Sequence, residues 1–495
     1  MKKFAIVIIG LTFFLSNCKN GSQTVFDIRF QDVREKVIGL VKEGKVASIS
    51  IAVAKDGKII WEEAFGYSNL EKKVRATSHT KYLSGSIAKT FTATGLMTLS
   101  EKGLVDIDKP VLVYLPNIEI RSFVGDERDI TIRHFLNHRS GMPSYCELFF
   151  EDESESPRDF RETARRYSIV TFKPGWSFIY SNLGYELIGY LISEVSGTSY
   201  SRFMEENVFL PLKMTETKVF ERGLSIDHSA ICYSPDFKPI PNYMGSYPGA
   251  DGIHFSAHDL IRFAMFHLKD HLKDQYPILS DETINKMQEN YPPSNTRYGI
   301  GWGIDVNDAG YRSVYHGGEG PGSDNFMRLI PSEDIALVIL CNNDIGDHLY
   351  EIQDEICNAL IPGFTKPKKE DQQDNESSAE PQIPEELLGK WKGKIVAYDR
   401  EIEVELKVNR IEGAIINLSG QQEKKIDLSV VTPDFMLGYF SGVIPTPDAL
   451  RYPDKIRLAL VRQGDRLSGS ATADQWIEER QMRYELSSWI ELIRN

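Results

Sequence analysis

An uncharged stretch follows Ser86-Ile87-Ala88-Lys89, and it constrains the fold of this chain strongly. From Thr90 through Ser100 the sequence TFTATGLMTLS contains no charged residue, and Glu101-Lys102-Gly103 then supplies a helix C-terminal stop. A helix without a charged face has to be buried on most sides. The chain must therefore enclose this helix, and its 495 residues suffice for two or three domains.

Ser86 and Lys89 stand at the start of this predicted helix, three residues apart. Side chains with that spacing share one helix face and can interact. A serine hydroxyl becomes a nucleophile when a neighbouring base takes its proton, and a lysine at the mouth of a buried helix can be that base. The alternative is an N-cap serine followed by a solvated lysine, because this spacing also occurs often by chance.

Strand and helix patterns predict how the first part of the chain is organised. Two strand patterns, SISIAVA and KIIWEEAFGY, meet at the hairpin signal Asp56-Gly57, and strand patterns return from Tyr298. Between Ser86 and about Ser280 the chain is mostly helical, and a last helix is expected near Leu349 to Leu360. This order predicts an α+β domain whose antiparallel sheet joins both ends of the segment.

A change of composition separates this domain from the rest. Lys366 to Pro384 has almost no apolar residues and is typical of a flexible linker. Beyond it, alternating segments such as EIEVELKV and KIRLALV predict a small β-barrel or β-sandwich. We expect an α+β domain over residues 30–365, a disordered linker over 366–384 and a β-rich domain over 385–495.

The N-terminus has the pattern of an export signal. Lys2-Lys3 precede an apolar run from Phe4 to Leu15 that is short for a membrane span. Leu15-Ser16-Asn17-Cys18 resembles a bacterial lipobox, although Asn17 replaces the usual small residue. We expect a lipoprotein-type signal over residues 1–18, a lipid on Cys18, a tether over 19–29 and a place in the bacterial cell envelope. Plain secretion and an uncleaved anchor are the alternatives, and both also place the fold outside the cytoplasm.

Charge and cysteine content exclude some classes of function. With 57 basic and 71 acidic side chains the formal net charge is −14, and no basic stripe appears, which argues against a nucleic-acid partner. The other four cysteines are scattered without metal-ligand spacing. Export permits disulfides between them, and free buried thiols are at least as plausible: Cys146, Cys232, Cys341 and Cys357.

Two further motifs carry side chains suited to catalysis. Tyr180-Ser181-Asn182 precedes a predicted helix that ends at Gly197, so Tyr180 lies on a turn from which its phenol can enter a cleft. A phenol next to an ammonium can act as a general base, although a packed turn tyrosine is the alternative. Tyr315 to Glu319, YHGGE, ends a predicted strand before the turn GPGS, where a backbone N–H can serve an oxyanion.

Taken in this order, the three motifs resemble the serine β-lactamase and penicillin-binding protein superfamily, closest to its class C β-lactamase, esterase and D-peptidase branch. The segments FLNHRSGMP, GADGIHFSAHDLIRF and YGIGWG agree, and the likeness covers roughly Phe30 to Pro362. The resemblance implies that Ser86 is acylated and that Lys89 and Tyr180 share the base role. It further implies that the backbone N–H groups of Ser86 and Glu319 form the oxyanion hole, and that Asn182 hydrogen-bonds either Lys89 or the substrate amide. The residues implied to contact the substrate or the oxyanion are Asn182, His316, Gly318 and Glu319. Lipocalin-like tails also occur in this family.

The third motif departs from that of true β-lactamases, which usually have Lys-Thr-Gly where this chain has His316-Gly317-Gly318. A lysine there is a fixed charge for a substrate carboxylate, whereas a histidine is mostly neutral at pH 7. We expect an ester or amide hydrolase of the esterase or D-amino-acid peptidase type, without cofactor or metal. The alternatives are β-lactamase or penicillin-binding activity proper, and a catalytically silent envelope protein that binds or senses a ligand.

Three other patterns have simpler interpretations. Ser323-Asp324-Asn325 matches an S-D-N element but follows the third motif, so we expect it to start the next strand. His134 and His138 are one helical turn apart but lack the glutamate of a metalloprotease helix, so we expect structural roles. The acidic run Glu151 to Glu155 is typical of a solvated loop, with the further hypothesis that it repels anionic substrates.

Overall fold

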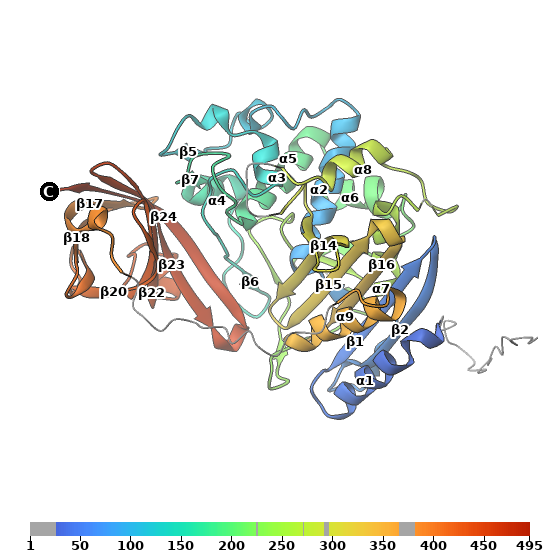
Figure 1. Ribbon diagram of the computed structural model, residues 1–495. Helices are drawn as coiled ribbons and strands as arrows, with labels where there is room; N and C mark the ends of the chain where they lie inside the picture. Colours follow the sequence, from blue (N-terminus) through green and yellow to red (C-terminus); the bar gives the residue numbers. More distant parts are fainter. Residues whose placement is uncertain (1–25, 224–225, 271, 292–296, 366–381) are drawn as a thin grey trace, which may run out of the picture.

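The computed structural model describes residues 26–223, 226–270, 272–291, 297–365 and 382–495. Figure 1 shows a large mixed domain beside a barrel, coloured orange to dark red, that the C-terminal strands form. The expected signal segment with Cys18 and most of the expected linker lie outside the described residues. Among the described helices, none is both long and apolar enough to cross a bilayer.

A seven-stranded sheet organises the large domain, in the order β13-β14-β15-β16-β1-β2-β3. β1 pairs with β16 antiparallel, with Ile49 opposite Cys341, so the sheet joins both ends of this domain as predicted. The first hairpin turns at Asp56 and Gly57, both with positive φ, as its turn chemistry predicts. The strands of this sheet are β1 (Ser48–Lys55), β2 (Lys58–Asn69), β3 (Val74–Arg75), β13 (Gly303–Val306), β14 (Arg312–Gly320), β15 (Ser323–Ile330) and β16 (Ile335–Cys341).

Alternation along β1 divides the core between the two faces of the sheet. Ile49, Ile51 and Val53 pack with α1 (Gln31–Lys42) and α9 (Asp347–Leu360) on one face. Ala52 and Ala54 face the helical block, which contains the buried helix α2 (Ala88–Glu101). Every residue of α2 from Ala88 to Leu99 is buried, and only its last two residues are not. This confirms the prediction, made from the absence of charged residues, that the helix is enclosed on most sides.

The helical block covers the second face of the sheet (Figure 1). Its other helices are α3 (Ile132–Leu136), α4 (Phe160–Tyr167), α5 (Asn182–Ser196), α6 (Tyr200–Met204), α7 (Ala257–His267) and α8 (Asp281–Met287). Short strand pairs (β5-β7, β6-β11 and β9-β10) and a three-stranded sheet (β4-β12-β8) tie its loops together. These strands are β4 (Tyr82–Leu83), β5 (Arg121–Ser122), β6 (Phe149–Phe150), β7 (Ile169–Val170), β8 (Lys218–Val219), β9 (Cys232–Tyr233), β10 (Pro239–Ile240), β11 (Tyr243–Met244) and β12 (Ile253–Phe255).

The C-terminal domain is a closed antiparallel barrel in which β24 pairs back with β17. Burial alternates along β18, so every second side chain of EIEVELKV points into the interior that this closure encloses. Of the two predicted options, barrel and sandwich, the barrel is therefore correct. Its strands are β17 (Gly389–Val396), β18 (Glu401–Asn409), β19 (Gly413–Leu418), β20 (Lys424–Thr432), β21 (Phe435–Ser441), β22 (Lys455–Gln463), β23 (Arg466–Ile477) and β24 (Met482–Arg494).

The last strand of the barrel contacts the helical block. The backbone of Glu485 in β24 exchanges two hydrogen bonds of 2.9 Å with Cys146. The indole ring of Trp489 stacks on Phe123, with ring centroids 4.8 Å apart. These contacts hold the barrel against the surface of the large domain.

Candidate active site

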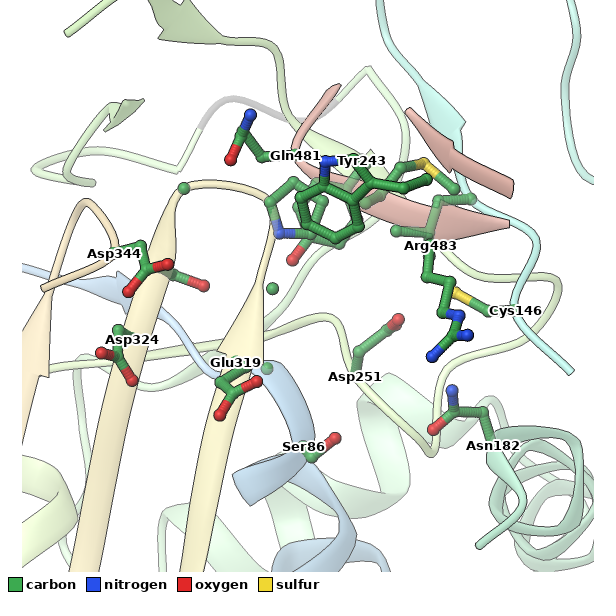
Figure 2. Close-up of a pocket in the computed structure, with 18 of the residues that line it drawn as sticks. Ser86, Cys146, Asn182, Tyr243, Asp251, Glu319, Asp324, Asp344, Gln481 and Arg483 are labelled. Carbon is green, nitrogen blue, oxygen red and sulfur yellow. The ribbon is translucent and has the colours of Figure 1, made fainter. Parts of the chain in front are cut away.

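Ser86 lies in a tight turn, Gly85–Ile87, immediately before α2. Gly85 has φ +49°, and a Cβ atom there would approach the carbonyl carbon of Gly318 to 2.6 Å. Only glycine therefore allows this turn to pack directly against β14. The result is that Ser86 stands between the start of a buried helix and the end of a strand, at the pocket shown in Figure 2.

Lys89 lies in the first turn of α2 and is fully buried. Its Nζ atom is 3.0 Å from Ser86 Oγ and 2.9 Å from the carbonyl oxygen of Ala250. No ion pair within the described parts of the chain includes Lys89. The predicted contact between this serine and this lysine is thus present, and the amine is oriented by a backbone carbonyl that sequence reasoning did not identify.

Tyr180 lies against the same amine, as the sequence-based hypothesis required. Lys89 Nζ is 4.9 Å from the centre of the Tyr180 ring. On its other side, Tyr180 packs on the His138 ring at 4.2 Å between centroids. The next residue, Ser181, donates its backbone N–H to His138 Nδ1 at 3.1 Å and caps α5 through its hydroxyl. His138 therefore positions the tyrosine.

The two histidines of FLNHRSGMP have structural roles. His134 Nδ1 accepts the backbone N–H of Thr131 in a capping box at the start of α3. Burial and the nearby Lys89 hold the pKa of His138 well below its usual range, so its ring is neutral and its Nδ1 can accept the bond from Ser181. This matches the expectation that the pair is structural.

Asn182 starts α5 and lines the pocket. Its side-chain nitrogen donates to the carbonyl oxygen of Tyr145 at 3.2 Å. The contact to Lys89 that the resemblance offered as one option is made instead by Ala250. The amide oxygen of Asn182 can accept a hydrogen bond from a substrate N–H group, which was the other option.

The end of β14 provides a free strand edge beside Ser86. In the described part of the sheet, β13 pairs only with Arg312–Tyr315, so the segment from His316 to Gly320 has no partner on that side. Glu319 lines the pocket, and a Cβ atom on Gly318 would approach the carbonyl oxygen of Ser84 to 2.2 Å. The backbone of this edge is thus held against the serine turn, where an N–H group can meet an oxyanion.

His316 lies behind this edge, with a relative exposure of 6%. Its Nδ1 is 2.6 Å from the carbonyl oxygen of Gly317, which requires a donor, so Nε2 accepts the hydroxyl proton of Tyr298 at 2.9 Å. Burial lowers the pKa of His316 to about 4, although the bond to Gly317 opposes this shift. Both ring nitrogens of His316 are therefore hydrogen-bonded within the protein, so neither is available to a substrate in this arrangement. The assignment of His316 to substrate binding stays a prediction.

The pocket itself is a cavity of about 470 Å³ whose walls come from both domains. The barrel contributes Trp476, Gln481, Met482 and Arg483, none of which the sequence analysis had linked to the site. Figure 2 shows Arg483 projecting towards Asn182 and Asp251. Its guanidinium is also bound by Asp474 at 2.8 and 2.9 Å.

Four acidic side chains also line the pocket: Asp251, Glu319, Asp324 and Asp344. Burial raises the pKa of Asp251, although Lys89 opposes the shift. Burial, with a contribution from Asp344, raises the pKa of Asp324 to about 7. Ser323-Asp324-Asn325 starts β15, as predicted, and the side chain of Asn325 bonds only backbone groups there.

The acidic run Glu151 to Glu155 holds the barrel. Glu153 is bound by Arg451, and Arg480 forms ion pairs with both Asp152 at 3.1 Å and Glu153 at 3.5 Å. Both arginines belong to the barrel domain. Asp152 and Glu153 are therefore paired with arginines at the domain interface, and the hypothesis that the run repels anionic substrates stays a prediction that depends on Glu151 and Glu155.

The four described cysteines, Cys146, Cys232, Cys341 and Cys357, are all free thiols. Cys341 and Cys357 are buried. Of the two possibilities open at the level of sequence, free thiols are therefore the correct one for the described part of the chain.

A serine next to a buried lysine and a tyrosine, at the junction of a helix and a strand edge, defines a serine acyl-transfer hydrolase. The comparisons with known proteins agree. The family described as Beta-lactamase matches residues 33–355, more than half of the chain, so the chain belongs to this family of serine hydrolases. The resemblance drawn from the three motifs is thereby confirmed.

Relatives and solved structures support this placement. The chain is 30% identical to penicillin-binding protein 4* of Bacillus subtilis (strain 168) over 329 residues, 60% of this chain and 68% of that protein. It is 27% identical to protein flp of Staphylococcus aureus (strain COL), over 61% of each chain. The octameric penicillin-binding protein homologue from Pyrococcus abyssi aligns with a TM-score of 0.58 at 25% identity, over 92% of this chain and 99% of that one. A β-lactamase/D-alanine carboxypeptidase from Pseudomonas syringae shares the fold, with a TM-score of 0.56 at 18% identity, over 67% of this chain and 98% of that one.

Proposed function

We propose that this protein cleaves an ester or amide bond through a covalent acyl-enzyme on Ser86, as an esterase or a D-amino-acid peptidase. The observation that carries the proposal is the 3.0 Å contact between Ser86 Oγ and the buried Nζ of Lys89. A binding protein has no need of a buried amine against a serine hydroxyl, because burying that amine costs free energy that only a function or a partner offsets. A catalytically silent binding protein is therefore the weaker alternative.

The reaction follows from the positions of the groups. The Lys89–Tyr180 pair accepts the proton of Ser86 Oγ as the oxygen attacks the substrate carbonyl. The developing oxyanion is met by backbone N–H groups of Ser86 and Glu319. The same pair returns the proton to the leaving alcohol or amine, which releases it and leaves Ser86 acylated. A water molecule, deprotonated by the pair, then attacks the ester and restores the serine. Lys89 and Tyr180 titrate as one coupled pair, so the first proton is assigned to the pair and not to either residue alone.

The polar groups around Ser86 favour uncharged or amine-bearing acyl substrates over carboxylate-bearing β-lactams. His316 stands where the lysine of true β-lactamases is usual, and its pKa of about 4 keeps it uncharged at neutral pH. The guanidinium of Arg483 in the pocket is already paired with Asp474. Without a free fixed cation among the described residues that line the pocket, a substrate carboxylate loses a charge-assisted bond of about 1.5–3 kcal/mol. β-Lactamase or penicillin-binding activity proper is thus the second candidate.

Export belongs to the same proposal. The pattern Lys2-Lys3, an apolar run and Cys18 supports a lipid-anchored protein of the bacterial cell envelope that acts on small esters, amides or peptides. Fractionation of cells with metabolic labelling by a palmitate analogue tests this directly. The parent should carry label in the membrane fraction and Cys18→Ala should not. Equal labelling of both would remove the anchor from the proposal.

A fluorophosphonate probe and p-nitrophenyl acetate hydrolysis test the chemistry. We expect Ser86→Ala to lose labelling and at least about 10⁴-fold in kcat. Lys89→Met should lose activity to a similar degree while keeping the thermal stability of the parent, because an apolar residue of similar length replaces a buried amine at little cost. The proposal fails if Ser86→Ala turns over substrate within about tenfold of the parent.

A further inference from the structure

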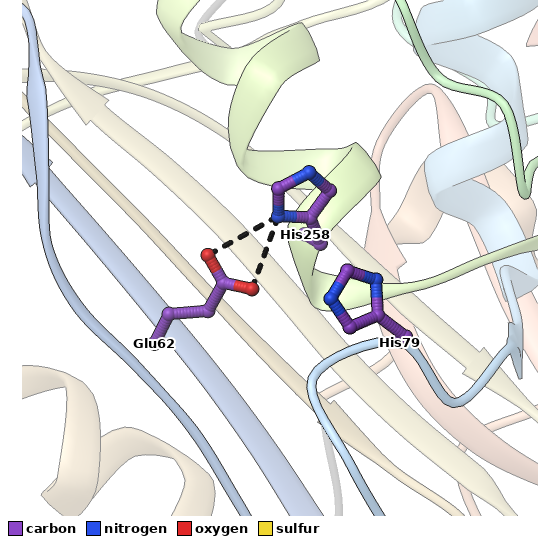
Figure 3. A group of neighbouring side chains, drawn as sticks. All are labelled: Glu62, His79 and His258. Carbon is purple, nitrogen blue, oxygen red and sulfur yellow. Dashed lines mark hydrogen bonds and ion pairs between the residues drawn. The ribbon is translucent and has the colours of Figure 1, made fainter. Parts of the chain in front are cut away.

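Three potential metal ligands converge outside the pocket. Glu62 lies on β2, His79 on the segment before β4 and His258 in the first turn of α7 (Figure 3). One ligand atom from each lies within 4.8 Å of the other two. No other group of three His, Cys, Asp or Glu side chains converges in this way among the described residues.

Two of the three ligands already have the spacing of a metal site. His258 Nδ1 is 3.1 and 3.2 Å from the two carboxylate oxygens of Glu62. Two ligands bound to zinc at about 2.0–2.1 Å and a tetrahedral angle are about 3.3 Å apart. The observed distance fits either a direct hydrogen bond or one edge of a zinc tetrahedron, so binding an ion requires little movement of this pair.

His79 is oriented by a second carboxylate. Its Nδ1 lies 3.0 Å from Glu216 Oε1, and Ser256 donates its hydroxyl to Glu216 at 2.8 Å. Because Nδ1 is held there, Nε2 is the nitrogen available to an ion, and Figure 3 shows a ring nitrogen of His79 facing Glu62 and His258. Metal-bound histidines commonly donate their other N–H to a carboxylate in this way, which fixes the tautomer that binds the ion.

The cluster is accessible to an ion from solvent. The side chains of His79 and His258 are 39% and 32% exposed, whereas that of Glu62 is 11% exposed. Two imidazole nitrogens with one carboxylate are a ligand set that suits zinc, whereas Ca²⁺ and Mg²⁺ prefer oxygen ligands alone. The segment that carries His79 continues through β4 (Tyr82–Leu83) to Ser86. A bound ion would therefore link this segment to β2 and α7.

We propose that Glu62, His79 and His258 bind one Zn²⁺ ion as a structural site, with water as the fourth ligand and Glu216 orienting His79.

A competition titration of chelator-treated, tag-free protein with a fluorescent zinc indicator at pH 8 tests the site. We expect one tight equivalent in the parent and its loss in His258→Gln. The matched control is His348→Gln, because His348 also pairs with a glutamate, Glu351, at 3.2 Å but has no third ligand. Zinc at about 100-fold above its Kd should raise the Tm of the parent by about 2–5 °C and leave that of His258→Gln unchanged.

Cobalt identifies the ligands independently of stability. Co²⁺ should give the visible absorption of a tetrahedral complex without a thiolate charge-transfer band, since no cysteine takes part. Glu62→Gln, which keeps the size of the side chain, should weaken binding by at least about tenfold, in line with the loss of a ligand. The proposal is overturned if the parent binds no zinc, if His258→Gln or Glu62→Gln binds it as tightly as the parent, or if the cobalt spectrum shows thiolate ligation.

Discussion

Asp448 provides a direct test of how the barrel is held against the hydrolase domain. It lies on the barrel side of the interface, with its side chain 11% exposed. Three groups of the α4 region contact it: Tyr167 Oη at 2.5 Å, Arg166 at 2.9 Å and Arg158 at 3.2 Å. Asp448→Ala removes all three contacts without changing any residue that lines the pocket.

The magnitude follows from what the partners lose. Removing one member of a buried ion pair typically costs about 3–5 kcal/mol, because the other charge is left without a partner. Here the cost is reduced, since Arg158 keeps Glu147 at 2.6 Å and Arg166 keeps Glu162 at 2.6 Å. We therefore expect a loss of about 2–3 kcal/mol in the free energy that holds the barrel in place.

The assay combines calorimetry with kinetics. The thermal transition that includes the barrel should fall by about 5–10 °C. The KM for ester substrates should rise several-fold, because Trp476 and Arg483 of the barrel line the pocket with Ser86. The control is Asp434→Ala, which breaks the 3.0 Å pair with Arg462 at a position where Asp434 is 76% exposed, and should cost less than about 1 kcal/mol.

The pH dependence gives a second readout of the same contact. Burial opposes ionisation of Asp448, but the bonds from Tyr167 and Arg166 outweigh it and lower the pKa of Asp448. Its contribution is therefore complete above the unfolded-state value of about 4 and is lost as the pH falls below it. Equal stability of Asp448→Ala and the parent at pH 7, or an equal loss in the Asp434→Ala control, would refute this account of the docking.

Two further predictions concern the strand edge beside Ser86. Gly318→Ala should lower the rate of fluorophosphonate labelling at least about 100-fold and destabilise the fold by about 1–3 kcal/mol, because the new Cβ meets the carbonyl oxygen of Ser84 at 2.2 Å. Gly39→Ala, on α1 with open space around the new Cβ, should leave labelling unchanged, and similar rates for both variants would contradict the packing argument. For His316, burial lowers the pKa to about 4, so unfolding takes up a proton between pH 6.5 and 4, and stability falls as the pH falls through that window. By pH 5 this amounts to about 2 kcal/mol, and denaturant titrations of His316→Gln should show a fall smaller by that amount.

Local sequence signals determined much of the site's framework. The missing charges from Thr90 to Ser100 gave the buried helix, and the cap at Ser181 with the stop at Gly197 set the bounds of α5. Asp56-Gly57 fixed the first hairpin. Such signals act between residues a few positions apart, so the printed sequence contains them completely. The proximity of Ser86 to Lys89 belongs to the same class, because both lie within one helical turn.

Only the tertiary structure decided which distant groups meet. The Ala250 carbonyl that orients Lys89 is 161 residues away along the chain, and the barrel residues that line the pocket lie still further from Ser86. The acidic run at Glu151 to Glu155 looked like a solvated loop until Arg451 and Arg480 were placed against it. The convergence of Glu62, His79 and His258 likewise depends on how β2 packs beside α7. Each of these contacts depends on the packing of whole elements, and no short-range pattern in the sequence records it.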